Sequence, residues 1–182
     1  MKVKDILIRA LKYAGREDAA DELAKGEVTD CKEAVETALY CFNAVEDEVA
    51  RNYFPLVRED SLLNVKGSFA YTQFSRVPKR ILSVKDGGGE IKFTQTSDGI
   101  KADSVAVTVR YEYLPVKKEV EDDSEFFGEH ADEKLFAAGT ASEFCLINGD
   151  VSQADYFENV YRSRIDALRI KGLAAFPPRR WV

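Results

Sequence analysis

The sequence predicts an α+β fold, in which a helical bundle carries an inserted small antiparallel β-sheet lobe. Near both ends of the chain, apolar residues recur at steps of three and four, a spacing typical of amphipathic helices. Between Leu62 and Leu114 they recur at steps of two, which is typical of strands with one buried face. The expected order is therefore helices, an inserted sheet, and helices again.

The stretch from Ala131 to Leu168 predicts two helices joined by a tight turn. Small residues on the first helix would face large ones on the second, which lets two helices approach closely. At the turn, Gly149 can adopt a positive φ, and either Asp150 or Ser152 can cap the second helix. The expected buried stripes are Leu135, Ala138, Ser142 and Cys145, widened by Phe136, Phe144 and Ile147, and then Ala154, Phe157, Tyr161, Ile165 and Leu168.

Three further helices are predicted near the N-terminus. The first is ended by Gly15, and the second spans Glu17 to Lys25. The third follows a sequence that resembles a capping box, Asp30-Cys31-Lys32-Glu33, and stops at Phe54 because Pro55 disfavours helical geometry there. The stripe of the first helix is Ile6, Leu7, Ala10, Leu11 and Ala14, and that of the third is Ala34, Val35, Ala38, Cys41, Phe42, Val45 and Val49.

Strands are expected at Leu62–Lys66, Arg80–Asp86, Glu90–Thr96 and Ser104–Tyr113. In the last of these, Val105, Val107, Val109, Tyr111 and Tyr113 would share one buried face. Gly87-Gly88-Gly89 predicts a hairpin loop and Ser97-Asp98-Gly99 the next turn. The resulting division places the helical bundle at 1–55 and 130–172, the β lobe at 56–115, an acidic linker at 116–129 and an extended tail at 173–182.

Composition limits the class of function. The net charge of −6 argues against broad binding to nucleic acid, which requires excess Lys and Arg. Cys31, Cys41 and Cys145 form no CxxC pair and are expected to be buried free thiols in a protein made in a reducing compartment. No apolar run approaches ~18 residues and the start lacks a signal-peptide core, so we expect a soluble protein without a membrane partner.

No catalytic constellation is evident, and we expect neither an enzyme nor a bound cofactor or metal. The single histidine, His130, precedes a helix and is better explained as a solvated or capping residue. The three glycines at 87–89 lack the GK[ST] of a phosphate loop. Phe69, Tyr71 and Phe74 suit strand packing better than base stacking.

The linker concentrates negative charge, without the ligand spacing of an EF-hand loop. Its acidic side chains either form a solvated charge run or provide a negatively charged working surface. The residues concerned are Glu119, Glu121, Asp122, Asp123 and Glu125.

The tail carries the strongest candidates for an interaction site. Trp181 is the only tryptophan and stands one residue from the end of the sequence, preceded by Arg179 and Arg180. Trp and Arg dominate interface hot spots. Either Trp181 folds back on the core of its own chain, or the tail docks into a partner or neighbouring subunit, with Phe176 in the same anchor.

These patterns resemble the head–tail adaptor (connector) proteins of tailed bacteriophages. The likeness rests on order and pattern rather than on a catalytic signature. It is carried by the helix Ala34–Phe54 with Cys41-Phe42-Asn43 and the exit Tyr53 to Leu56, by Arg80-Ile81-Leu82-Ser83-Val84 and the return strand Val107 to Pro115, and by the run Ala137 to Cys145 with the ending Pro178-Arg179-Arg180-Trp181.

The resemblance implies a virion structural protein of the phage neck, made in the host bacterial cytoplasm. It implies a homo-oligomeric ring, expected to be dodecameric, docked below the portal protein through the helical bundle and the tail. Such a ring extends the DNA channel, passes genomic DNA without sequence-specific binding, and offers a platform to the next neck or tail protein. An acidic wall would suit sliding DNA. The alternatives are a small regulatory binding module without catalysis, or another neck or tail-completion protein.

Overall fold

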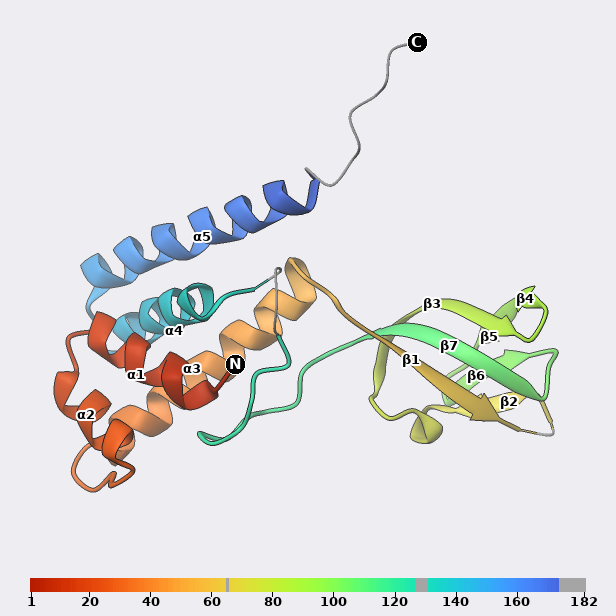
Figure 1. Ribbon diagram of the computed structural model, residues 1–182, viewed down its shortest axis with the longest axis horizontal. Helices are drawn as coiled ribbons and strands as arrows, with labels where there is room; N and C mark the ends of the chain where they lie inside the picture. Colours follow the sequence, from red (N-terminus) through yellow and green to blue (C-terminus); the bar gives the residue numbers. More distant parts are fainter. Residues whose placement is uncertain (65, 127–130, 174–182) are drawn as a thin grey trace, which may run out of the picture. The chain divides into compact units, whose positions relative to one another are not determined.

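A computed structural model describes residues 1–64, 66–126 and 131–173 (Figure 1). The chain divides into two compact units, which we call the helical unit (Met1–Glu48 and Val116–Val182) and the β unit (Val49–Pro115). The fold is α+β with an inserted antiparallel sheet region, as the sequence predicts. The predicted β lobe starts at residue 56, after the third helix. The β unit instead starts at Val49, inside that helix.

The first three helices are α1 (Val3–Tyr13), α2 (Glu17–Lys25) and α3 (Lys32–Asn52). The apolar stripes expected on α1 and α3 are buried, apart from Ala14, which is half-buried. The capping-box prediction before α3 needs correction. One carboxylate oxygen of Glu22 in α2 accepts the backbone N–H groups of Thr29, Asp30 and Cys31 at 3.0, 3.2 and 3.2 Å. The connection is therefore held by the preceding helix.

Helices α4 (Glu133–Ile147) and α5 (Val151–Leu173) form the predicted hairpin. Gly149 has φ +81°, and Asp150 is the cap, since its carboxylate accepts the N–H of Gln153 at 3.1 Å. A Cβ at Gly139 would stand 2.8 Å from Val45 Cγ1 and 3.1 Å from the Tyr161 ring. Helices α3, α4 and α5 therefore pack closely at Gly139, because this residue has no side chain to separate them.

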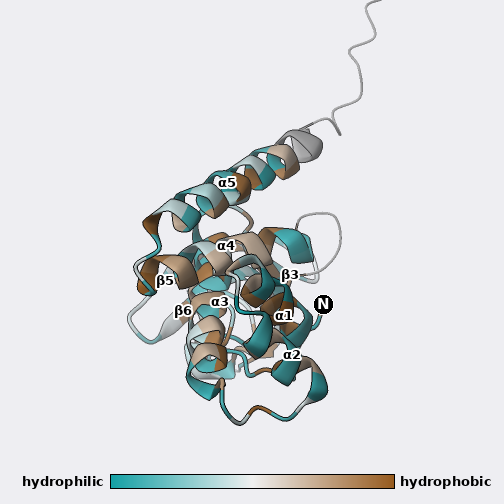
Figure 2. Ribbon diagram, turned by 90° about the vertical axis from the view of Figure 1, so that its left-hand side faces the viewer, coloured by the Kyte–Doolittle hydropathy of each residue, from teal (hydrophilic) through white to brown (hydrophobic). Residues whose placement is uncertain are grey.

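Two details of the hairpin differ from the prediction. Ile147 does not widen the buried stripe, because it lies at the end of α4 and is 55% exposed. Helix α5 continues beyond the predicted Leu168, through Gly172 to Leu173, since one glycine costs a helix only about 1 kcal/mol. In Figure 2, α4 is coloured hydrophobic over most of its length and α2 largely hydrophilic, as expected for a central and a peripheral helix.

The β unit contains two antiparallel sheets rather than one. The first has the strand order β1-β7-β3-β4 and the second β2-β6-β5. The expected strand at Leu62–Lys66 lies earlier, and Glu90–Thr96 is split in two. The strands are β1 (Leu56–Leu63), β2 (Ser68–Ala70), β3 (Pro78–Asp86), β4 (Gly89–Glu90), β5 (Phe93–Gln95), β6 (Gly99–Ala102) and β7 (Ala106–Tyr113), with a 3₁₀ turn at Tyr71–Gln73.

Side chains from both sheets make one core inside the β unit. Val107, Val109 and Tyr111 of β7 face inward as predicted, whereas Val105 precedes the strand and is exposed. Both expected turns are present: Asp86 pairs with Gly89 across the glycine loop, and Thr96 N–H donates to Gly99 O at 2.9 Å. The buried core members are Leu62, Phe69, Phe74, Ile81, Val84, Ile100, Val107, Val109 and Tyr111.

Candidate functional site

The described part of the acidic segment, 116–126, is not a free linker but is bound to the helical unit along its length. Val3 N–H donates to Asp122 O at 3.0 Å, and Ser124 N–H donates to Met1 O at 2.9 Å. Lys2 Nζ lies 3.0 Å from an Asp123 carboxylate oxygen. The segment therefore pairs with the N-terminus as a short antiparallel bridge.

On the side that faces α3, the side-chain amide of Asn43 makes two hydrogen bonds to the backbone of the segment. Asn43 Oδ1 accepts the N–H of Lys118 at 2.6 Å, and Asn43 Nδ2 donates to Lys118 O at 3.1 Å. The Lys118 ammonium lies 3.1 Å from Glu125, and both side chains are at most 10% exposed. A nearly buried ion pair of this kind fixes the course of the backbone, since breaking it would leave a charge without water or partner.

Beneath the segment, the carboxylate of Glu46 in α3 is 1% exposed. Its Oε1 accepts the Ser124 hydroxyl at 2.6 Å and the Glu125 N–H at 3.0 Å. Its Oε2 has no hydrogen-bond partner among the described residues. Burial raises the pKa of Glu46, and the hydrogen bonds from Ser124 and Glu125 together with the charge of Lys118 only partly offset that rise.

The five acidic residues proposed as a working surface therefore divide. Glu119, Glu121, Asp122 and Asp123 are exposed, whereas Glu125 turns inward to Lys118 and does not belong to an outer surface. A hydrogen bond and charge from Lys2 lower the pKa of Asp123, and Lys4 lies 3.4 Å from Glu121. Much of this acidity thus serves to attach the segment to the N-terminus.

The four residues of the predicted docking tail, Phe176, Arg179, Arg180 and Trp181, lie outside the described residues, as does His130. The three cysteines are described. All are buried free thiols, as predicted, and burial raises the pKa of Cys41 to about 12. They act as small core residues rather than as nucleophiles.

A polar cluster in the β unit combines residue types that also occur in catalytic sites. The Tyr111 hydroxyl donates to Asp60 at 2.6 Å, and the Ser75 hydroxyl donates to the same carboxylate at 2.6 Å. Although burial opposes ionisation, these hydrogen bonds lower the pKa of Asp60. Because the carboxylate also accepts the Ser75 N–H at 2.8 Å, the cluster holds the loop after the 3₁₀ turn onto β1.

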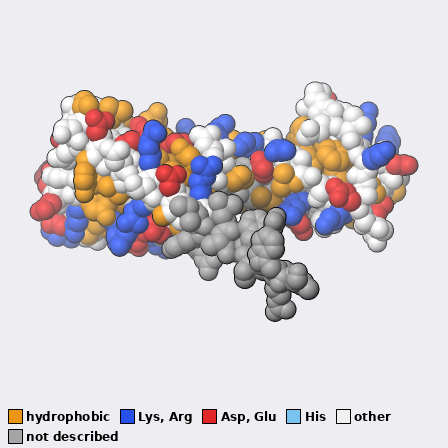
Figure 3. Space-filling model, turned by 90° about the horizontal axis from the view of Figure 1, so that it is seen from above, with side chains coloured by type: hydrophobic (Ala, Val, Ile, Leu, Met, Phe, Trp, Pro, Cys, Tyr) orange, Lys and Arg blue, Asp and Glu red, His pale blue; other side chains and the backbone are white. Residues whose placement is uncertain are grey.

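An apolar surface lies at the α4–α5 turn, where Leu146, Ile147 and Val151 are 55%, 55% and 57% exposed. On the face displayed in Figure 3, apolar side chains likewise reach the surface among charged ones. Because the helical spacing predicts that Ile147 is buried, the sequence does not reveal this exposed patch. Three neighbouring exposed aliphatic side chains favour contact with another protein.

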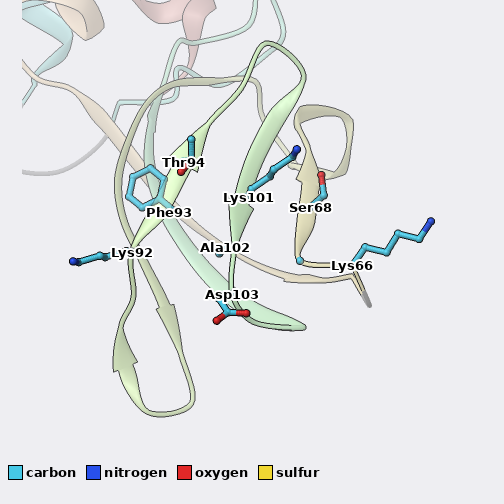
Figure 4. A pocket seen from close by; sticks show the side chains of 9 residues that line it. Lys66, Ser68, Lys92, Phe93, Thr94, Lys101, Ala102 and Asp103 are labelled. Atoms are coloured by element: carbon cyan, nitrogen blue, oxygen red, sulfur yellow. The ribbon is translucent and has the colours of Figure 1, made fainter.

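The outer face of the small sheet β2-β6-β5 is cationic (Figure 4). Ser68, Lys101 and Thr94 are opposite one another across its three strands. Lys66 and Lys92 lie just before β2 and β5, and Asp103 directly follows β6. Together with the sheet residues they border an open hollow of about 610 Å³. We call the six residues the lysine face: Lys66, Ser68, Lys92, Thr94, Lys101 and Asp103.

The two units carry opposite net charge. The β unit has ten Lys and Arg against seven Asp and Glu, a net charge of +3. The helical unit has 16 against 25, a net charge of −9. The net charge of the whole chain hides this asymmetry, which becomes visible when each expected domain is counted separately.

In the described residues there is no group of three or more His, Cys, Asp or Glu placed to hold a metal ion. Nor does any helix of the described ranges have the length and apolarity to cross a membrane. What the described surfaces offer is charge and apolar area suited to protein contacts. A scan against protein-family models and a search of curated proteins find no match to the chain.

Proposed function

We propose that the chain is a head–tail adaptor of a tailed bacteriophage, a structural protein of the virion neck. In this role copies form a ring below the portal protein, extend the DNA channel and provide the platform for the next neck or tail protein. The observation that carries the proposal is the division into two units, a helical one interrupted by a β unit with its own core.

That division suits ring assembly because a closed ring needs two different surfaces on every subunit. The helical unit offers the apolar patch Leu146, Ile147 and Val151, and the β unit offers the lysine face. The tail would supply a further anchor, with Trp181 and Phe176 as apolar contacts and Arg179 and Arg180 binding carboxylates of the portal. The four exposed acidic residues Glu119, Glu121, Asp122 and Asp123 would leave passing DNA unbound.

Native mass measurement of the purified chain, alone and with the portal protein of the same phage, tests the proposal. We expect a folded monomer alone and a ring on the portal, because the exposed apolar patch is small and assembly then depends on a template. A stable dimer whose mass is indifferent to portal would contradict the adaptor function.

Deletion of residues 173–182 tests the tail separately. We expect the melting temperature to change little while incorporation into particles is lost, because two prolines in the tail would lower the entropy cost of docking. Trp181→Ala in the full-length chain is the matched single change, with Val182→Ala as its control. If the deletion instead unfolded the monomer, Trp181 would be a core residue and the docking tail would be ruled out.

A further inference from the structure

We infer that the lysine face of the β unit docks onto the acidic end of the helical unit of a second copy of this chain. The acidic end comprises residues 17–36, which form α2, the connection after it and the start of α3. This inference rests on the proposed ring and names the surfaces that join its neighbours.

The acidic end concentrates negative charge. Its 20 residues include eight acidic and two basic side chains. Glu22 folds the connection back by binding the backbone N–H groups of residues 29–31, so the acidic side chains of α2 and of the connection share one end of the unit. Asp18 pairs with Arg16 and Glu36 with Lys32.

The other acidic side chains of this end have no such partner. Within the described ranges no ion pair forms at Glu17, Asp21, Glu27, Asp30 or Glu33. All five are exposed. Like charges so close together repel one another, and a cationic surface placed against them would relieve that repulsion.

The lysine face provides a surface of that kind. Lys66, Lys92 and Lys101 come from three different segments and are all exposed around one open hollow (Figure 4). Ser68 and Thr94 add hydroxyl groups that can donate to carboxylates.

The observations favour a protein partner over nucleic acid. Asp103 lies between Lys66 and Lys92, where it would repel phosphates but could accept from a lysine such as Lys25 or Lys32 of the partner surface. The helical unit carries a net charge of −9, which opposes approach of the whole chain to DNA. A contact between two unlike surfaces is heterologous, the type that closes into rings.

Two charge-reversed variants test the contact. The lobe variant carries Lys66→Glu, Lys92→Glu and Lys101→Glu, and the acidic-end variant carries Asp21→Lys, Glu27→Lys and Asp30→Lys. We expect each variant alone to lose portal-dependent ring formation, because like surfaces would then meet at every contact. We expect a 1:1 mixture to recover it, because an even-membered ring can alternate the two variants.

A matched control reverses three charges on the other sheet of the β unit, with Arg80→Glu, Lys85→Glu and Arg110→Glu. It makes the same change in net charge and should assemble like the wild type. Assembly of the lobe variant alone at the wild-type level would overturn the inference and leave the adaptor proposal intact. So would failure of the mixture when both variants show the wild-type melting temperature.

A second measurement works without portal. Isotope-labelled and unlabelled wild-type copies are mixed at high concentration and treated with a zero-length carbodiimide crosslinker. We expect crosslinks from Lys66, Lys92 or Lys101 of one copy to residues 17–36 of another, with a yield that falls several-fold between about 0.05 and 0.5 M salt.

Each alternative has a distinct outcome. Crosslinks confined to single copies would place the contact within one chain and overturn the inference. Salt-sensitive binding of duplex DNA by the wild type, lost in the lobe variant and with no crosslink between copies, would assign the face to phosphates instead. Crosslinks between copies without any portal-dependent ring would support the docking surfaces and contradict the adaptor function.

Discussion

The helical unit and the β unit reach a closed core by different routes. In the helical unit the N-terminus pairs with residues about 120 positions later in the sequence, through the bridge between Lys2 and Asp123. In the β unit β3 pairs with β4 and β5 with β6, which are neighbours in sequence. The other pairings, β1 with β7, β2 with β6 and β3 with β7, are long-range, but they all join strands of the same unit. The helical core therefore depends on the chain on both sides of the insertion, whereas the β core is self-contained.

The largest expected effect is a loss of stability that is confined to one of the two cores. Phe136 is fully buried, with ring centroids 5.9 Å from Phe42 and 5.4 Å from Phe126. Phe136→Ala should destabilise the helical unit by about 3–5 kcal/mol, the usual cost of deleting a buried aromatic side chain. Phe69→Ala is the counterpart in the β unit, where Phe69 is equally buried.

Urea unfolding followed by helical circular dichroism, and by amide hydrogen exchange of the β strands, measures both variants. We expect Phe136→Ala to lower the midpoint of the helical signal more than that of the β unit, and Phe69→Ala to do the reverse. Equal shifts of both signals in both variants would mean that the two units unfold as one, and the comparison above would be wrong.

A smaller effect tests the close approach in the helical hairpin. Gly139→Ala places a Cβ 2.8 Å from Val45 Cγ1 and 3.1 Å from the Tyr161 ring, so the helices must separate. We expect a loss of about 1–3 kcal/mol, as for other overpacked cores. Gly87→Ala in the β3–β4 turn is the control, since its Cβ would meet nothing within 4 Å. Similar thermal melts for the two variants would show that the hairpin is loosely packed.

The smallest effect concerns pH. Burial raises the pKa of Glu46 above its unfolded value, so the folded state binds a proton more tightly than the unfolded state. The stability this contributes is present below the unfolded pKa of about 4.5 and is lost as pH rises through the folded pKa. Glu46→Gln should remove this part of the pH dependence, so its stability relative to the wild type should increase toward neutral pH. A constant difference between pH 4 and pH 8 would show that Glu46 keeps an ordinary pKa.

Sequence periodicity predicted the helices well because their buried faces are set by local spacing. The stripe Ala154, Phe157, Tyr161, Ile165 and Leu168 is buried or half-buried in α5. Periodicity failed at the ends of elements, where a side chain such as Ile147 keeps the spacing of the core but has nothing left to pack against.

The candidate sites were harder to predict than the helices. Lys66, Lys92 and Lys101 are separated in sequence and border the same hollow only because β2, β6 and β5 pair. The acidic segment was interpreted from its charge alone, although its contacts to Met1, Asn43 and Glu46 decide its role. Long-range pairing of this kind leaves no local pattern in a single sequence.

The bridge between the N-terminus and the acidic segment also sets the order in which the chain can fold during synthesis. Translation completes the β unit at Pro115 before it reaches Ser124, whose N–H binds Met1 O. Helix α4, which packs against α1, is made later still. The full burial of Ile6, Leu7 and Leu11 on α1 therefore requires the chain on the far side of the insertion. An N-terminal tag would be attached directly beside this bridge, where the Met1 ammonium lies 3.4 Å from Asp123.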